Sequence, residues 1–185
     1  MVTLTALWLP ILLSAVAVFL VSSLIHMVFK YHQGDFKPVP SEEAIMASLR
    51  PYNIPPGDYF MPYCRDMKEM KSPEYVDKLN KGPHAVMTVL PSGPSGMGKS
   101  LALWFAYSLI VGGFAAWVAG RALDEGAEYM DVFCFAGVTA FAGYGLALLQ
   151  QSIWWGKSWS ATLKSVFDAL LYALVTAGIF GWLRP

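Results

Sequence analysis

One stretch of the sequence matches a pattern that binds phosphate. Residues 93–100 fit G-x-x-x-x-G-K-[ST] letter for letter, and the four defined positions are occupied by Gly93, Gly98, Lys99 and Ser100. In nucleotide-binding proteins this loop follows a buried strand, opens a helix that packs on a sheet, and holds phosphates with its backbone N–H groups. Here residues 100–120 carry no charge and are long enough to cross a bilayer. We therefore interpret the match as a glycine-rich entry to a membrane span, and we expect no cofactor.

Two ionisable side chains fall inside apolar runs. Asp168 is the only acid well inside such a run, and an intramembrane carboxylate is a candidate proton or ion relay. Lys164 lies four residues earlier, so a pair on one helix face is the simpler expectation. His26 lies near the end of the first run and can hydrogen-bond a neighbouring helix. A haem site would need a second histidine at the same depth, whereas His32 and His84 lie in the polar segment.

Sulfur-containing side chains recur every three residues in the polar segment. They are Met61, Cys64, Met67 and Met70, with His84 downstream. Thioether and thiolate groups suit Cu(I), so the four residues form a candidate metal site. The same spacing also describes one apolar face of a short helix, which is the alternative explanation. The chain's two cysteines, Cys64 and Cys134, do not indicate a disulfide framework or a zinc site.

Small residues recur within the later apolar runs and suit close contact between helices, because they let two backbones approach. The glycines that we assign to helix packing are Gly112, Gly120, Gly137 and Gly143. No nucleophile–base pair or pair of carboxylates is evident in the sequence. We therefore expect a protein that is not an enzyme.

The elements that position these residues follow from composition. Hydrophobic residues make up 56% of the 185-residue chain and charged residues only 14%, against about 25% in soluble domains. The apolar residues concentrate in four runs, at 1–29, 100–120, 132–150 and 165–183. This pattern predicts an all-α membrane protein with four transmembrane helices. The net charge of zero gives no basic surface for nucleic acid.

The polar segment 30–99 joins the first two runs and is rich in proline. It holds 10 of the 12 prolines and 9 of the 13 basic residues. Short helices are predicted at 42–49, capped by Ser41, and within 72–80, where Ser72 is the cap. Residues 58–63 and 85–90 are strand candidates, which suggests a small hairpin in this extramembrane segment.

Orientation is predicted from lysine and arginine near the ends of the runs. Five such residues flank the side that holds segment 30–99 and an aromatic, basic turn at 154–164, and two flank the opposite side. Because basic residues favour the cytoplasmic side, we expect segment 30–99 in the cytoplasm and both termini outside.

The sequence resembles a family of bacterial inner-membrane proteins of uncharacterised function. The resemblance rests on the order of its parts: one apolar run, a segment with PGDYFMPYC, a later GPSGMGKSLALWF and three further apolar runs. The most distinctive piece is Gly98–Phe105. The resemblance implies a multi-pass protein of the bacterial inner (cytoplasmic) membrane with four spans. It implies no catalytic residues.

Three functional hypotheses follow. The first is an accessory or scaffold subunit of a larger membrane complex of respiratory or photosynthetic type, with the lipid bilayer and other membrane subunits or a second copy as partners. The second is a small transporter or ion- and proton-handling protein that uses Asp168 and His26. The third is a copper-handling protein that uses Cys64 and the neighbouring methionines.

Overall fold

The protein is described by a computed structural model that covers residues 2–94 and 96–184. Four helices in it are long and apolar enough to cross a membrane, namely Leu4–Phe29, Met97–Ala122, Tyr129–Trp155 and Trp159–Trp182. The prediction of an all-α membrane protein with four spans is therefore confirmed. The chain forms two compact units, which we call the helical unit (residues 2–36 and 96–184) and the polar unit (residues 37–94).

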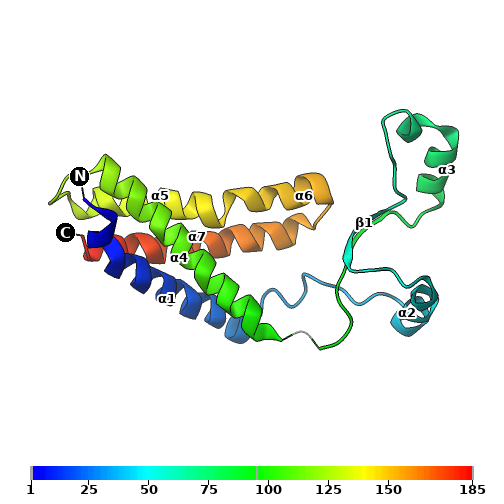
Figure 1. Cartoon of the computed structure of the whole chain (residues 1–185), viewed down its shortest axis with the longest axis horizontal. Helices are drawn as coiled ribbons and strands as arrows, with labels where there is room; N and C mark the ends of the chain where they lie inside the picture. Colours follow the sequence, from blue (N-terminus) through cyan, green and yellow to red (C-terminus); the bar gives the residue numbers. More distant parts are fainter. Residues whose placement is uncertain (1, 95, 185) are drawn as a thin grey trace. The chain divides into compact units, whose positions relative to one another are not determined.

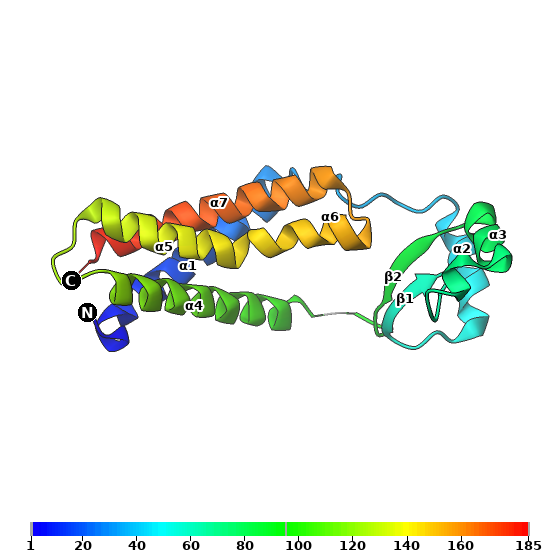
Figure 2. The ribbon, with the colours of Figure 1, turned by 90° about the horizontal axis from the view of Figure 1, so that it is seen from above.

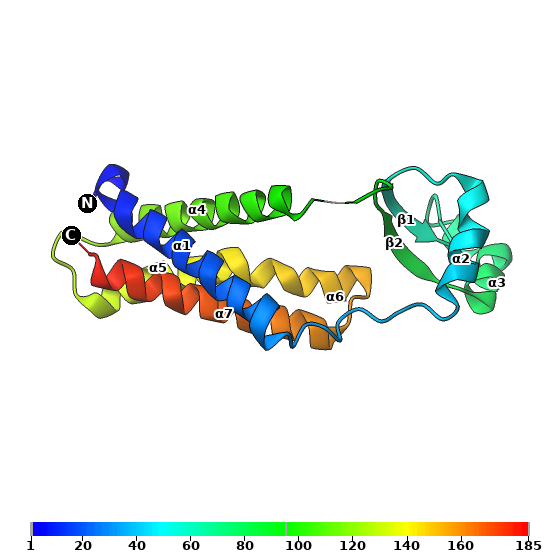
Figure 3. The same cartoon turned by 90° about the horizontal axis from the view of Figure 1, so that it is seen from below.

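The helical unit is a bundle of the four spans (Figure 1). The first span joins a short turn η1 (Leu4–Leu7), α1 (Trp8–Leu24) and a π-helical turn η2 (Ile25–Phe29). The second span is α4 (Met97–Ala122). Figures 2 and 3 show α5 and α7 running side by side along the bundle, with α1 and α4 against them.

Small residues bring the first two spans together. A Cβ added to Gly112 of α4 would lie 3.2 Å from the Ser14 hydroxyl oxygen of α1. A Cβ at Gly120 would lie 2.8 Å from the carbonyl oxygen of Val2, whose N–H donates to the Gly120 carbonyl at 3.1 Å. Both glycines therefore sit where a neighbouring backbone or side chain leaves no room for a larger residue.

Close contacts at glycine also occur between the other spans. A Cβ at Gly143 would approach Val111 of α4 to 3.1 Å, and a Cβ at Gly137 would lie 3.0 Å from the Cβ of Ala177 in α7. Large apolar side chains on the outer faces remain exposed, among them Leu20, Phe114 and Val138. Small residues inside and large apolar residues outside are the expected arrangement when the surrounding solvent is lipid.

The third span is interrupted near its middle. It consists of α5 (Tyr129–Tyr144), a short 3₁₀ turn η5 (Leu146–Leu148) and α6 (Leu149–Trp155). Two glycines flank Tyr144 and lower the local helix propensity. The Tyr107 hydroxyl donates to the Gly143 carbonyl at 2.5 Å, so a carbonyl beside the break has a partner.

The fourth span begins earlier than the sequence predicted. We expected a turn at 154–164, whereas α7 (Trp159–Trp182) already includes Lys164. Gly156 ends α6 with a φ of +66°, and the Ser158 hydroxyl accepts the N–H of Ala161 at 3.5 Å. A left-handed glycine and a capping serine confine the turn to three residues.

The polar unit contains two short helices and one pair of strands. The predicted helices are confirmed as α2 (Glu42–Leu49) and α3 (Pro73–Lys81), with Ser72 Oγ accepting the N–H of Tyr75 at 3.1 Å. Ser41 adopts a φ of +52° and makes no side-chain cap, contrary to expectation. β1 (Gly57–Met61) pairs antiparallel with β2 (Ala85–Val89), and η3 (Arg50–Tyr52) and η4 (Glu69–Lys71) are single turns.

Close packing of α5 on α7 gives a first prediction. Gly137→Ala forces two Cβ atoms to within 3.0 Å, so we expect a net destabilisation of about 1–2 kcal/mol once overpacking is set against the gain in helix propensity. Gly113→Ala is the matched control, because no atom lies within 4 Å of its added Cβ. Thermal unfolding of each variant in detergent measures the difference.

A double variant identifies the cause. If the Ala177 contact is responsible, Gly137→Ala costs less stability in an Ala177→Gly background than in the wild-type background. An equal cost in both backgrounds contradicts the packing explanation.

Candidate functional site

The candidate site begins where the first span ends. The Lys30 N–H donates to the Ile25 carbonyl at 3.1 Å, which closes the π-helical turn η2. Lys30 then takes a φ of +54°, and two turns follow through bonds from Gln33 to Lys30 and from Asp35 to His32. These turns place the side chains of Tyr31, His32 and Asp35 against the beginning of α7. Turns of this π type often occur at functional sites.

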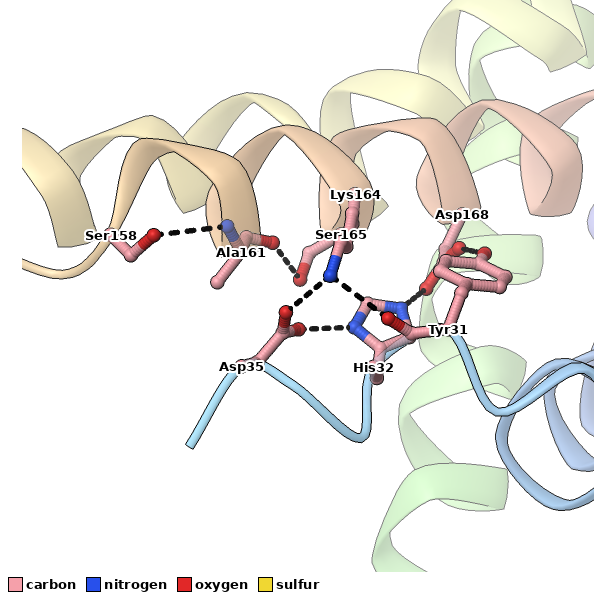
Figure 4. Close-up of polar contacts among 8 residues, drawn as sticks. All are labelled: Tyr31, His32, Asp35, Ser158, Ala161, Lys164, Ser165 and Asp168. Carbon is pink, nitrogen blue, oxygen red and sulfur yellow. Dashed lines mark hydrogen bonds and ion pairs between the residues drawn. The ribbon is translucent and has the colours of Figure 1, made fainter. Parts of the chain in front are cut away.

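Lys164 of α7 holds the turn from one side. Its ammonium nitrogen donates to Asp35 Oδ1 at 2.7 Å and to the Tyr31 carbonyl oxygen at 2.8 Å (Figure 4). We expected Lys164 to pair with Asp168 on the same helix, and that expectation is wrong. The turn after the first span supplies both partners of Lys164 instead, the Asp35 carboxylate and the Tyr31 carbonyl.

His32 connects Asp35 to Asp168. Its Nδ1 lies 2.6 Å from Asp35 Oδ2, and its Nε2 lies 2.7 Å from Asp168 Oδ2. The Tyr31 hydroxyl donates to the other oxygen of Asp168 (Figure 4). When both carboxylates are ionised, both ring nitrogens must carry a proton to make these bonds, so the ring is an imidazolium.

The four charged groups form a connected chain, which we call the relay: Lys164, Asp35, His32 and Asp168. Side-chain exposure is 32% at Lys164, 9% at Asp35, 17% at His32 and 5% at Asp168, so the two ends of the relay differ most. With His32 protonated, two positive and two negative charges cancel. Hydrogen bonds from Lys164 and His32 hold the pKa of Asp35 below its usual value.

A cavity of about 640 Å³ lies at the same end of the helical unit. Asp168 lines it together with His26 of η2 and residues of α1, α4, α5 and α7. Its size falls within the range of small-molecule sites, about 300–1,000 Å³. The innermost group of the relay is therefore also a wall of the cavity.

Four aromatic side chains form a continuous wall of this cavity. They are Trp104 and Tyr107 of α4, Tyr144 of α5 and Tyr172 of α7. Neighbouring ring centroids lie 5.6–6.0 Å apart, in tilted or edge-to-face arrangements. The indole N–H of Trp104 donates to Ser22 Oγ at 2.9 Å, which ties α4 to α1 beside the wall.

His26 lies closer to a second histidine than the sequence suggested. Its ring centroid is 5.0 Å from that of His32, although we expected no histidine at matching depth. The reversal at Lys30 brings the polar segment's first histidine back against the end of the span. Within residues 2–94 and 96–184 no group of three His, Cys, Asp or Glu side chains is arranged to hold a metal ion.

The phosphate-binding pattern lies across the start of α4. Gly98, Lys99 and Ser100 belong to the first turns of that helix, and Gly93 has a φ of +110°. Ser95 lies outside the described residues. The helix that follows is one of the four candidate spans. Our interpretation of the glycine-rich pattern as the entry to a membrane span depends on this context.

The copper candidates lie in separate local structures. Met61 ends β1, Met70 lies in the single turn η4, and Cys64 and Met67 lie between them. The Cys64 thiol donates to the Asp66 carbonyl at 3.0 Å. The alternative of one helical face is wrong, because this stretch forms only a turn. Copper binding stays a prediction.

Comparison of the chain with protein-family models, with curated proteins and with solved structures finds no match. The resemblance centred on Gly98–Phe105 therefore stays a prediction. Tyr31, His32 and Asp35 were not singled out from sequence. The only available signal was a histidine and an aspartate three residues apart, just after a span.

Removing the relay's outer cation gives a second prediction. Lys164→Ala leaves Asp35 with one charged partner, so we expect a loss of about 1–2 kcal/mol, between the values for surface and buried ion pairs. The exposed Lys157→Ala is the control and is expected to unfold at the wild-type temperature. Equal melting temperatures for both variants, measured in detergent, contradict the assigned contact.

The pH dependence of stability gives a third prediction. Because the folded pKa of Asp35 is lowered from the usual 3.8, its contribution is present above that pH and is lost as the pH falls through the folded value. The difference in melting temperature between wild type and Asp35→Asn should therefore hold from pH 7 to 5 and shrink below pH 3.8. Glu42→Gln, on an exposed side chain, is the control.

Proposed function

We propose that the protein is a small membrane transporter that binds its substrate in the cavity and exchanges it for a proton held by the His32–Asp168 pair. The observation that carries the proposal is the position of Asp168. This side chain lies in a candidate span, lines the cavity and is bonded to His32. An acid with these three properties is what a coupled proton or ion pathway requires.

The relay gives the proton a route. Lys164 lies at its more exposed end, and Asp168 lies at the cavity. His32 contacts both carboxylates and can take a proton from one side and release it on the other.

The accessory-subunit hypothesis stays a prediction. Nothing in the contacts within one chain bears on a respiratory or photosynthetic partner. A purely structural relay, which only fastens residues 31–35 to α7, is the direct competitor of our proposal. It predicts that a charge-neutral replacement that keeps the hydrogen bonds has no effect on ion movement.

Proton movement is tested with protein in vesicles that contain a pH-sensitive dye. Four probes are added in turn: phenyltrimethylammonium, benzenesulfonate, phenylalanine and glucose. We expect at least one to change the internal pH with wild-type protein, and Asp168→Asn to slow that change at least tenfold. The variant removes the carboxylate that pairs with His32, so the proton on His32 loses its charged partner at the cavity.

Asp131→Asn, on an exposed position at the start of α5, is the matched control. Each variant must elute as a single species with the wild-type melting temperature. If no probe moves protons with wild-type protein, or if Asp168→Asn is as active as wild type, the proposal is wrong.

For localisation we propose the bacterial inner membrane, with the polar unit in the cytoplasm. The basic residues near the span ends support this orientation. A membrane-impermeant thiol reagent should label Cys64 weakly in intact cells and strongly after permeabilisation. The assay uses a Cys134→Ser background, because Cys134 is also exposed. Strong labelling of intact cells would place the polar unit outside.

A further inference from the structure

The walls of the cavity discriminate between ligand charges. Asp168 is a carboxylate on its surface, and the described residues that line it include no lysine or arginine. Lys164 is directed to Asp35 and the Tyr31 carbonyl instead. An anionic ligand would therefore find no fixed positive partner there, whereas a cation would find a carboxylate in a site of low polarity.

The aromatic wall favours the same charge. Trp104, Tyr107, Tyr144 and Tyr172 line the cavity, and Tyr172 lies one helical turn after Asp168 on α7. The face of an aromatic ring is electronegative and attracts a cation within about 6 Å, most strongly when the cation is desolvated. A carboxylate beside a cluster of aromatic rings is the chemistry that recognises a quaternary or protonated amine with an apolar body.

We propose that the cavity binds an organic monocation, with its ammonium group at Asp168 and its apolar part against the four aromatic rings. This inference rests on the proposed function and names its substrate class. Inorganic cations fit less well, because the wall is mainly apolar and Asp168 is the one carboxylate among the described residues that line it, whereas a hard metal ion is commonly held by several carboxylate or carbonyl oxygens.

The relay explains how such a cation exchanges for a proton. With His32 protonated the relay is neutral, and a further positive charge in the cavity is disfavoured. When His32 gives up its proton to water, Asp35 keeps Lys164 as partner and Asp168 carries the unbalanced negative charge. The bound cation then replaces the lost proton, so one proton leaves for each cation that binds.

The groups facing His32 agree with this exchange. They are Asp35 and Asp168 at its two nitrogens, Tyr31 with its ring centroid at 4.6 Å, and His26 at 5.0 Å. Positive charges on both histidines would repel each other at this distance. The site therefore binds one proton at a time in place of the cation.

Calorimetry of the 185-residue chain in lipid nanodiscs tests the inference. Phenyltrimethylammonium is compared with tert-butylbenzene, its neutral isostere, and with benzenesulfonate. We expect the cation to bind at least tenfold more tightly than either. Titrations at pH 7 in two buffers of different ionisation enthalpy count the protons, and about one should be released per bound cation.

Variants locate the site. Asp168→Asn should weaken cation binding at least tenfold, and Trp104→Leu or Tyr107→Leu should weaken it about two- to thirtyfold, the range of a cation–π contact. Phe105→Leu is the matched control. The ring centroid of Phe105 lies 6.0 Å from that of Phe19, and Phe105 is not among the residues that line the cavity. A change at Phe105 as large as that at Trp104 would overturn the placement.

The outcomes separate this inference from the proposed function. Equal binding of the neutral isostere, preference for the anion, or no binding of the cation overturns the inference. Proton exchange then still stands if another probe drives Asp168-dependent proton movement. Conversely, cation binding without proton release supports the ligand class and contradicts proton exchange.

Discussion

The structure depends on satisfying one carboxylate inside a bundle that faces lipid. Asp168 has a side chain only 5% exposed, and an unpaired charge at such a place is costly. Tyr31 and His32 supply its partners, Asp35 in turn bonds to His32, and Lys164 bonds to Asp35. The path of the chain after the first span follows from this requirement. The π-helical turn, the left-handed Lys30 and two tight turns all serve to bring these side chains back onto α7.

Close packing and the cavity are consequences of the same bundle. Glycines and alanines let α5 approach α7 and let α4 approach α1, so the contacts at the end of the bundle that holds the termini are tight. Toward the other end the large aromatic residues Trp104, Tyr144 and Tyr172 pack against one another where three spans meet. These rings and Asp168 line the cavity, which therefore lies beside the relay.

Charge balance links the relay to the cavity. In a site of low polarity a carboxylate without a positive partner is unfavourable, so a positive charge placed beside it stabilises the site. A proton on His32 and an organic cation at Asp168 are two ways to meet that need, and they exclude each other because only one negative charge is in excess. In our proposal, the relay and the cavity therefore form one site with two alternative states.

The sequence by itself determined the four spans, because long uncharged runs can be stable only in lipid or a buried core. It also determined α2 and α3, whose prolines, acids and glycines mark their ends locally. The partner of Asp168 was decided only by tertiary structure. Lys164 is near it in sequence, but His32 is 136 residues away and reaches it through a chain reversal. Likewise His26 and His32 become neighbours through Lys30, and the aromatic wall joins three spans. Local patterns specify elements, whereas the pairing of a buried charge depends on which side chains the packed bundle brings within hydrogen-bond distance.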